Sequence, residues 1–264
     1  MKLKLDQGYI SYDQVGKGIP LLFIHGYPLS RKIWQAQCSD LLDIASILSI
    51  DLRGHGETYS FDLPYTMDLL AEDCKRVVDH MGIMEPVVVC GLSMGGYVTF
   101  AMYRKYPDMF RGMILTSTRA AIDTPEGKAN RDATINNVYT QGIEFIVDGM
   151  LPKLISPLTL SSHPDLVHSL RNIMLETSVQ GVVGVSQAMR DRPDSTPLLP
   201  QLHLPVLIVH GADDQIIPLH EAELMHEQIP GSKLIVIPGA GHLLNMEQTD
   251  AYNQALRNFL QSLG

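Results

Sequence analysis

The chain has few cysteines, and their arrangement suits neither a disulfide framework nor a metal site. Cys38, Cys74 and Cys90 are odd in number, widely spaced and free of any C-x-x-C pair. We therefore expect reduced, mostly buried thiols in a cytoplasmic protein. The glycine spacings of dinucleotide-binding and phosphate-binding loops are also missing. The sequence thus predicts chemistry that needs no metal and no cofactor.

Long apolar runs and an excess of positive charge are absent as well. No stretch is long and apolar enough to span a membrane, and residues 1–6 alternate charged and apolar side chains where a secretory signal would be uninterruptedly apolar. The formal net charge is -9, with a pI near 5.5, so the protein's field repels phosphate backbones and anionic headgroups. We expect neither nucleic acid nor membrane as a partner, and either a monomer or a homodimer.

What the sequence does contain is typical of a globular α/β protein. Hydrophobic residues make up 45% of its 264 residues and charged residues 19%, enough for a substantial core. Alternating residues 2–15 predict an antiparallel hairpin, and residues 67–81 carry apolar side chains at helical spacing. Six short runs that are apolar on both faces predict strands of a parallel sheet covered by helices: 20–24, 47–50, 86–90, 112–115, 205–209 and 233–237. The predicted fold is a doubly wound, mostly parallel sheet.

One connection in this pattern is far too long. Roughly ninety residues separate the strand ending near Thr116 from the one starting at Pro205, and a crossover normally needs far fewer. The intervening chain carries helical patterns over 126–150, 164–176 and 179–189, interrupted by prolines. We predict a helical cap over residues 119–196, inserted into a core made of residues 1–118 and 197–264.

Ser93 stands in a glycine-flanked segment, Gly91-Leu92-Ser93-Met94-Gly95, between a predicted strand and a helical pattern. A serine on a sharp strand-to-helix turn leaves no room for side chains two residues before and after it, which favours glycine there. The turn sets the hydroxyl beside a helix N-terminus, whose free amides stabilise negative charge. We predict that Ser93 is a nucleophile, the alternative being a tightly packed turn. A near match, residues 184–188, follows no strand and is predicted to be plain helix.

A serine nucleophile needs a histidine to take its proton and a carboxylate to orient that histidine. His242 follows the last predicted strand on a glycine-rich loop, which leaves its imidazole free to approach a serine. Asp213 and Asp214 both follow the strand 205–209, and the chain order Ser, Asp, His is the one expected. Asp214 lies four residues before Pro218, the usual place of the acid, so we predict Asp214 with Asp213 supporting the turn.

Two backbone amides are expected to bind the oxyanion of the reaction. One belongs to Met94, the residue after the serine, and the other to Tyr27, in the loop that follows the strand 20–24. For His25 we expect a hydrogen-bonding role that holds this loop in shape. The charged turn over residues 51–56 lacks phosphate-loop spacing, so we interpret it as structural.

The segments carrying these residues together resemble the α/β-hydrolase superfamily, in the right order and over most of the chain outside the predicted cap. Within it, the sequence looks similar to small carboxylesterases, 3-oxoadipate enol-lactonase-like enzymes and cofactor-free haloperoxidases. The resemblance implies acyl transfer through Ser93 beneath a helical cap, without a metal. The serine departs from haloalkane dehalogenases and epoxide hydrolases, which use aspartate at that position. The matching segments are 25–28, 51–56, 91–96, 211–214 and 238–242.

The leading hypothesis is hydrolysis of a small or medium uncharged ester or lactone by a Ser93–His242–Asp214 triad. Alternatives are perhydrolase or haloperoxidase activity at the same triad, and a ligand receptor on this fold with little turnover. Arg190 or Arg192 could bind a substrate carboxylate, or either could pair with Asp191 or Asp194 on the surface. Candidate substrate-binding residues, which could equally form the core of the cap, are Tyr27, Trp34, Met150 and Leu154, together with Leu151, Ile155, Leu158 and Met174.

Overall fold

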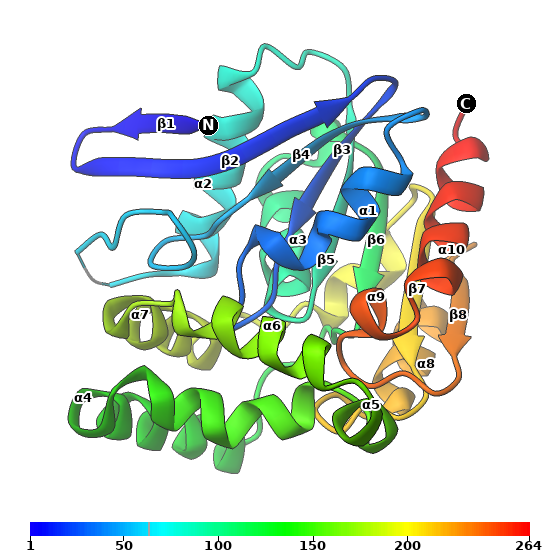
Figure 1. Ribbon diagram of the computed structural model, residues 1–264. Helices are drawn as coiled ribbons and strands as arrows, with labels where there is room; N and C mark the ends of the chain where they lie inside the picture. Colours follow the sequence, from blue (N-terminus) through cyan, green and yellow to red (C-terminus); the bar gives the residue numbers. More distant parts are fainter. Residues whose placement is uncertain (63) are drawn as a thin grey trace.

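The computed structural model describes residues 1–62 and 64–264 and contains one eight-stranded sheet (Figure 1). Its order is β1-β2-β4-β3-β5-β6-β7-β8. β1 pairs antiparallel with β2, and β2 with β4, while every other neighbouring pair is parallel. The predicted fold class is confirmed. The strands are β1 (Lys2–Leu5), β2 (Gly8–Gly16), β3 (Ile19–Ile24), β4 (Ala45–Ile50), β5 (Val87–Leu92), β6 (Phe110–Thr116), β7 (Val206–Gly211) and β8 (Lys233–Ile237).

Helices cover both faces of the sheet because the central strands are apolar on both sides. In β5, Val87 and Val89 belong to one buried cluster, whereas Val88 and Cys90 belong to another on the opposite face. The first cluster packs against α2 (Met67–His80), α3 (Met94–Lys105) and α8 (Leu219–Gln228). The second packs against α1 (Gln35–Asp40), α9 (Leu244–Glu247) and α10 (Thr249–Gln261). Short 3-10 turns are η1 (Arg31–Trp34), η2 (Pro107–Met109) and η3 (Thr196–Gln201).

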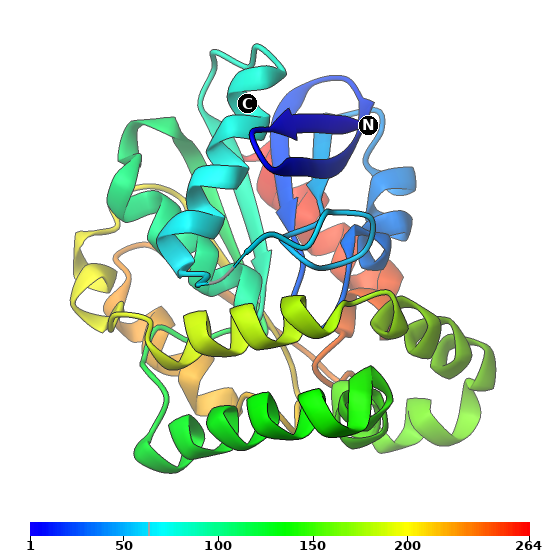
Figure 2. The ribbon, with the colours of Figure 1, turned by 90° about the vertical axis from the view of Figure 1, so that its left-hand side faces the viewer.

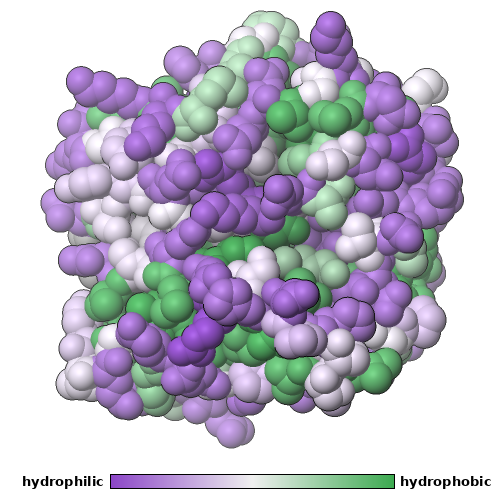
Figure 3. All heavy atoms as spheres, viewed as in Figure 1, coloured by the Kyte–Doolittle hydropathy of each residue, from purple (hydrophilic) through white to green (hydrophobic). Residues whose placement is uncertain are grey.

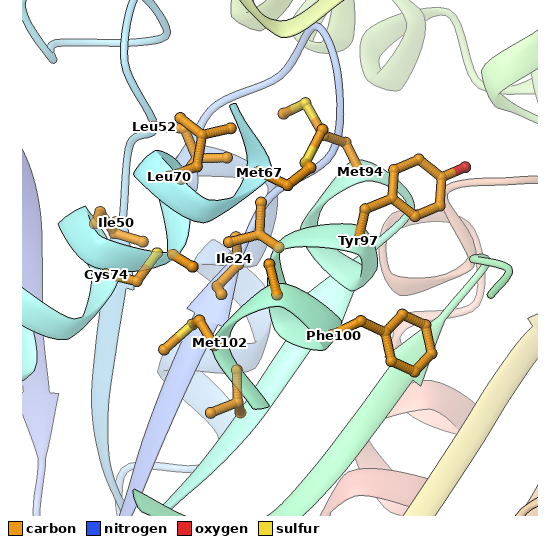
Figure 4. Close-up of a cluster of buried hydrophobic side chains, with 14 of the residues drawn as sticks. Ile24, Ile50, Leu52, Met67, Leu70, Cys74, Met94, Tyr97, Phe100 and Met102 are labelled. Carbon is orange, nitrogen blue, oxygen red and sulfur yellow. The ribbon is translucent and has the colours of Figure 1, made fainter. Parts of the chain in front are cut away.

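The packing of α2 on α3 fixes the helix that follows Ser93. Figure 4 shows Met67, Leu70 and Cys74 of α2 in one apolar cluster with Met102 of α3. The side chain of Tyr97, also from α3, turns its hydroxyl away from this cluster. This packing holds α3 against α2, and a well-packed helix suits a site that depends on accurate placement of one side chain.

Four further helices, here called the cap helices, lie beyond the carboxyl ends of the parallel strands in both ribbon views (Figures 1 and 2). They are joined to the rest of the chain by backbone bonds such as Ser178 N to Gly54 O, at 2.9 Å, and Leu243 N to Leu154 O, at 2.9 Å. The boundaries of the predicted cap, residues 119 and 196, remain a prediction. The cap helices are α4 (Pro125–Leu154), α5 (Pro157–Ser162), α6 (Pro164–Leu175) and α7 (Val179–Arg190).

The prolines of this region do not all act as breaks. Pro157 and Pro164 occupy the first turns of α5 and α6, where a missing N–H is harmless and the fixed φ suits a helix. α5 was not predicted, because the prolines on either side of it were interpreted as interruptions. α4 runs past Pro152 but is interrupted earlier, at Gly142, whose φ of 75° and ψ of -173° are not helical. Ser186, in the near match to the serine motif, lies inside α7 as expected.

The surface drawn in Figure 3 is mostly hydrophilic, with smaller hydrophobic patches between hydrophilic side chains. The larger exposed apolar side chains include Tyr139, Phe145 and Leu158 of the cap helices. Across residues 1–62 and 64–264, none of the helices combines the length and the apolar character needed to cross a membrane.

Candidate active site

Ser93 lies on a strained turn between β5 and α3. Its φ of 54° and ψ of -112° fall where non-glycine residues are uncommon. The turn is held from below, because Ser93 N donates to Thr116 O at 2.9 Å and Thr118 Oγ1 donates to Ser93 O at 2.8 Å. These bonds tie the turn to the end of β6. A strained residue that its surroundings hold in place is typical of a functional site.

The glycines on either side of Ser93 are required by close backbone approach. A Cβ atom on Gly91 would lie 2.3 Å from Gly95 O, and one on Gly95 would lie 2.3 Å from Ile24 O. Both distances are far below any van der Waals contact, and the obstructing atoms are backbone. The sharp turn therefore admits no side chain at either position, which is the steric reason predicted from the motif.

His242 and Asp214 are in direct contact. His242 Nδ1 lies 2.8 Å from Asp214 Oδ2, and the other carboxylate oxygen accepts the amides of Ile216, at 2.8 Å, and Ile217, at 3.0 Å. Burial alone would raise the pKa of Asp214, but His242 and the two amides outweigh it and lower that pKa. The carboxylate is thus ionised near neutrality and accepts a proton-bearing Nδ1. Asp213, by contrast, is exposed.

A second histidine lies beside this pair. His210 Nε2 is 2.9 Å from Ile217 O, to which it donates, and 3.6 Å from Asp214 Oδ2. Its side chain is fully buried, and burial lowers its pKa, so the ring is neutral near pH 7. His210 lies near the end of β7 and was not among the residues predicted for the site. Only the fold shows that it packs against the predicted catalytic carboxylate.

The loop after β3 presents a free amide next to the serine turn. Within the described residues, the amides of Tyr27 and Met94 donate no hydrogen bond to the protein. The loop is shaped by His25, whose Nε2 accepts the amide of Leu52 at 3.0 Å while Nδ1 donates to Gly26 O at 2.7 Å. Burial lowers the pKa of His25 to about 4, which keeps the ring neutral and able to accept. His25 therefore has the structural part expected of it.

The charged turn over residues 51–56 is likewise structural. Asp51 is fully buried and pairs with Arg31, and Arg53 pairs with buried Asp73. Thr58 Oγ1 donates to Asp51 O at 2.7 Å. Each charge is thus matched within the protein, as the interpretation of this turn requires.

A cavity of about 110 Å³ joins the predicted residues. Ser93 and His242 line it together, and so do the predicted binding residues Tyr27 and Met150. It is small compared with typical drug-sized ligand pockets of about 300–1,000 Å³. The remaining lining residues, none of which the sequence analysis proposed for substrate, are Tyr97, Arg119, Arg131, Met189, Ile216 and Ile217.

Six of the eight candidate binding residues do not line this cavity, Trp34 and Leu154 among them. Trp34 is fully buried, with its ring stacked on Phe23 at a centroid distance of 4.5 Å. Leu154 is fully buried in the same apolar cluster as Trp34. Their part in substrate binding stays a prediction, since the sequence pattern of an apolar residue near a cap does not distinguish a pocket lining from a core position. The two arginines first considered for a substrate carboxylate are also occupied: Arg190 pairs with Asp132 and Asp191.

Arg192 instead takes part in a cluster, here called the Asp123 cluster, that consists of Asp123, Arg119, Arg131 and Arg192. Asp123 Oδ1 accepts Arg119 Nη2 at 2.6 Å and Arg192 Nη1 at 2.9 Å, while Oδ2 accepts Arg131 Nε at 3.1 Å. The Arg192 guanidinium also lies over the ring of Tyr97, 4.0 Å from its centroid. Burial would raise the pKa of Asp123, but Arg131 and Arg192 together lower it to about 2.

The Asp123 cluster predicts a stability that depends on acid pH. The folded pKa of about 2 lies below the model-peptide value, so the stabilisation is complete above about pH 4 and is lost as the pH falls toward 2. The pH-dependent part is about 2 kcal/mol, and about half of it should be gone by about pH 3. Urea unfolding should therefore show that Asp123→Asn destabilises the protein less at about pH 3 than at about pH 6.

The matched control for this measurement is Asp148→Asn. Asp148 is exposed and pairs with half-exposed Arg171, so its replacement should have little effect at either pH. An equal loss of stability from Asp123→Asn at both pH values would contradict the assignment.

The chain matches one protein family over most of its length and resembles several individual proteins. The family described as "alpha/beta hydrolase fold" matches residues 19–249. A 3-oxoadipate enol-lactonase of Acinetobacter baylyi is 28% identical over 89% of this chain and 86% of its own length. A non-heme haloperoxidase of Rhodococcus erythropolis is 28% identical over 96% of each chain.

Among solved structures, a thermophilic esterase from Thermogutta terrifontis, determined with malate bound, superposes with a TM-score of 0.96. It is 39% identical in sequence, and the match covers 100% of this chain and 99% of the esterase. The likeness therefore extends over the cap helices as well as the sheet.

Proposed function

Because the chain belongs to the α/β-hydrolase family, we propose that it is a serine hydrolase that cleaves small to medium carboxylic esters or lactones through an acyl-enzyme. The observation that carries the proposal is the contact of His242 Nδ1 with Asp214, at 2.8 Å, beside a cavity that Ser93 also lines. A histidine held through Nδ1 has its Nε2 free to act as a base.

In the proposed reaction, Ser93 Oγ attacks the carbonyl carbon while His242 Nε2 takes its proton. Ionised Asp214 keeps the proton on Nδ1 and stabilises the imidazolium that forms. The amides of Tyr27 and Met94 bind the oxyanion of the tetrahedral intermediate. His242 then gives its proton to the leaving alkoxide, and a water molecule repeats the cycle on the acyl-enzyme to release the acid.

Esters and lactones are preferred as the substrate class because of the relatives. The Thermogutta structure is described as an esterase and the Acinetobacter protein as an enol-lactonase. Both names fit the attack of a serine on an ester carbonyl. The two reactions differ only in the alcohol, which is released when an ester is cleaved and stays attached to the acyl group when a lactone is opened.

Perhydrolysis at the same residues is the second candidate. It is favoured by the Rhodococcus relative, which is named a non-heme haloperoxidase. Hydrogen peroxide would replace water in the attack on the acyl-enzyme: the bond between Ser93 Oγ and the acyl carbon breaks, Ser93 regains its proton, and the acyl group is released as a peracid. Perhydrolysis would show itself as peroxide-dependent halogenation in acetate buffer. This halogenation should disappear in a buffer that contains no carboxylic acid, which distinguishes the reaction from simple hydrolysis.

The proposed function is tested by a panel of straight-chain esters. Because the cavity measures only about 110 Å³, we expect kcat/KM to fall by about tenfold or more from butanoate to octanoate esters. A phosphonate that reacts with activated serines should attach to Ser93, as located by peptide mass spectrometry. A receptor with little turnover would release no product and leave Ser93 unlabelled, and that result would refute the proposal.

A further inference from the structure

The cavity that Ser93 lines also contains two guanidinium groups. Arg119 comes from the segment after β6, and Arg131 comes from α4 of the cap helices. The two arginines therefore reach the cavity from different sides, Arg119 from the end of the sheet and Arg131 from the cap helices. Charged side chains are expensive to bring into a small cavity unless something there neutralises them.

The protein itself neutralises them only in part. Asp123 accepts one N–H from each of Arg119, Arg131 and Arg192, so one carboxylate is shared by three cations. Glu221 adds a second, weaker ion pair to Arg119 at 3.8 Å, beyond hydrogen-bond length. Within residues 1–62 and 64–264, Arg131 makes no hydrogen bond other than the one from Nε, which leaves both of its Nη groups free to donate.

Further donors in the same place lack a carboxylate acceptor. Arg119 Nε is buried with no hydrogen-bond partner among the described residues, and the buried hydroxyl of Tyr27, a residue only 5% exposed, has only the hydroxyl of Ser186 as a side-chain neighbour to donate to. Burial raises the pKa of the Tyr27 hydroxyl, so it carries its proton and can donate. Buried donors are nearly always satisfied, and a cavity that gathers several unsatisfied ones is suited to an anionic ligand group.

We infer that Arg131, assisted by Tyr27 and Arg119, binds a second carboxylate of the substrate, so that the preferred substrates are esters or lactones bearing a carboxylate apart from the reacting carbonyl. The planar guanidinium offers two parallel N–H donors, the geometry that carboxylates favour. This inference rests on the proposed function and replaces the expectation of an uncharged substrate. It moves the anion-binding role from Arg190 and Arg192, which are already paired, to Arg131.

Two matched pairs of stable alkyl esters test the inference by titration of released acid. Ethyl hydrogen glutarate and ethyl pentanoate differ only in a terminal carboxylate on the acyl side. The acetate ester of 4-hydroxybutanoate and butyl acetate differ in the same way on the alcohol side. At least one pair should show a kcat/KM ratio, charged over neutral, of about tenfold or more, which is the range of one charge-assisted bidentate contact.

Arg131→Met should lower that ratio to near one. Arg131→Lys should leave an intermediate value, because lysine keeps the positive charge but lacks the two parallel N–H donors of a guanidinium. The fold should survive, since Asp123 keeps Arg119 and Arg192 and the Arg131 side chain is 24% exposed. The control is Arg171→Met, a half-exposed cap arginine paired with Asp148, which should not change the ratio.

The outcomes separate the inference from the proposed function. If the neutral esters are hydrolysed but neither pair shows a preference for the charged ester, the inference is overturned and the proposed function stands. The same holds if Arg131→Met leaves the ratio as it is in the wild type. If no ester of either pair is hydrolysed and Ser93 takes no phosphonate, the proposed function fails.

Discussion

Replacing Ser93 by alanine is expected to lower kcat for a short ester by about 10⁶-fold, leaving only the small enhancement that substrate binding and the oxyanion amides supply. The hydroxyl is the only atom lost, and it is the atom that would form the acyl-enzyme. His242 and Asp214 would remain in contact but would have no nucleophile to activate. The measurement is the rate of acid release, followed at enzyme concentrations high enough to detect the residual activity.

The loss should be separable from unfolding. Alanine and serine are comparably strained at the φ of 54° found here, so the thermal midpoint should change little. Ser161→Ala, on the exposed side of α5, serves as the matched substitution and should keep full activity. A Ser93→Ala protein that is folded and retains more than about a hundredth of the wild-type rate would exclude Ser93 as the nucleophile.

Asp214→Asn is expected to have the second largest effect, lowering kcat by about 10⁴-fold. The amide keeps the size of the side chain, but it can present a donor to His242 where the carboxylate presents an acceptor. The imidazole would then place its proton on Nε2 and could no longer accept one from Ser93. Loss of the negative charge also removes the group that stabilises the imidazolium during the reaction.

The neighbouring residue provides a matched control for this prediction. Asp213 carries the same carboxylate one position earlier in the chain, but it is exposed. Asp213→Asn should therefore leave kcat within about threefold of the wild type, as for an ordinary surface change. If the two effects were reversed, Asp213 would be the acid and the contact at 2.8 Å would be irrelevant to catalysis. Equal, small effects would mean that His242 needs no carboxylate partner.

The sequence predicts best the features that arise from neighbouring residues. The turn at Ser93 depends on two glycines within the same five residues, and the strands before it show themselves by short apolar runs. The choice of Asp214 over Asp213 also follows from a local spacing, the distance to Pro218. Each of these inferences needs only the chemistry of a short segment.

The cavity lining could not be predicted in the same way. Trp34 and Met150 are both apolar residues near the expected site, but one is buried in the core and the other lines the cavity. Which of these happens depends on how α4 lies across the sheet, a long-range relation that periodicity does not contain. The sequence around Arg131 is also that of an ordinary helix and gives no sign of a binding role. That role follows from the contact with Asp123, eight residues earlier, which Arg192 shares from far along the chain.

Prolines illustrate the same limit within the cap helices. Proline removes one donor and fixes one dihedral angle, and this disrupts a helix interior but suits a helix start. Pro157 and Pro164 are starts, and Pro152 lies in the last turn of α4. The residue type alone does not distinguish these positions, so three cap helices were predicted where the structure has four.

Asp123 has a consequence for how this protein could be altered. Asp123 accepts hydrogen bonds from Arg119 and Arg192, and so it holds together the two ends of the long segment that contains the cap helices. When the two ends of a segment are held together, making the segment longer adds little to the free-energy cost of loop closure, only about 0.6 kcal/mol for each doubling of its length. Cap segments of different length or sequence could therefore be inserted between these two ends without loosening the sheet, provided that Asp123 and its contacts with Arg119 and Arg192 are kept.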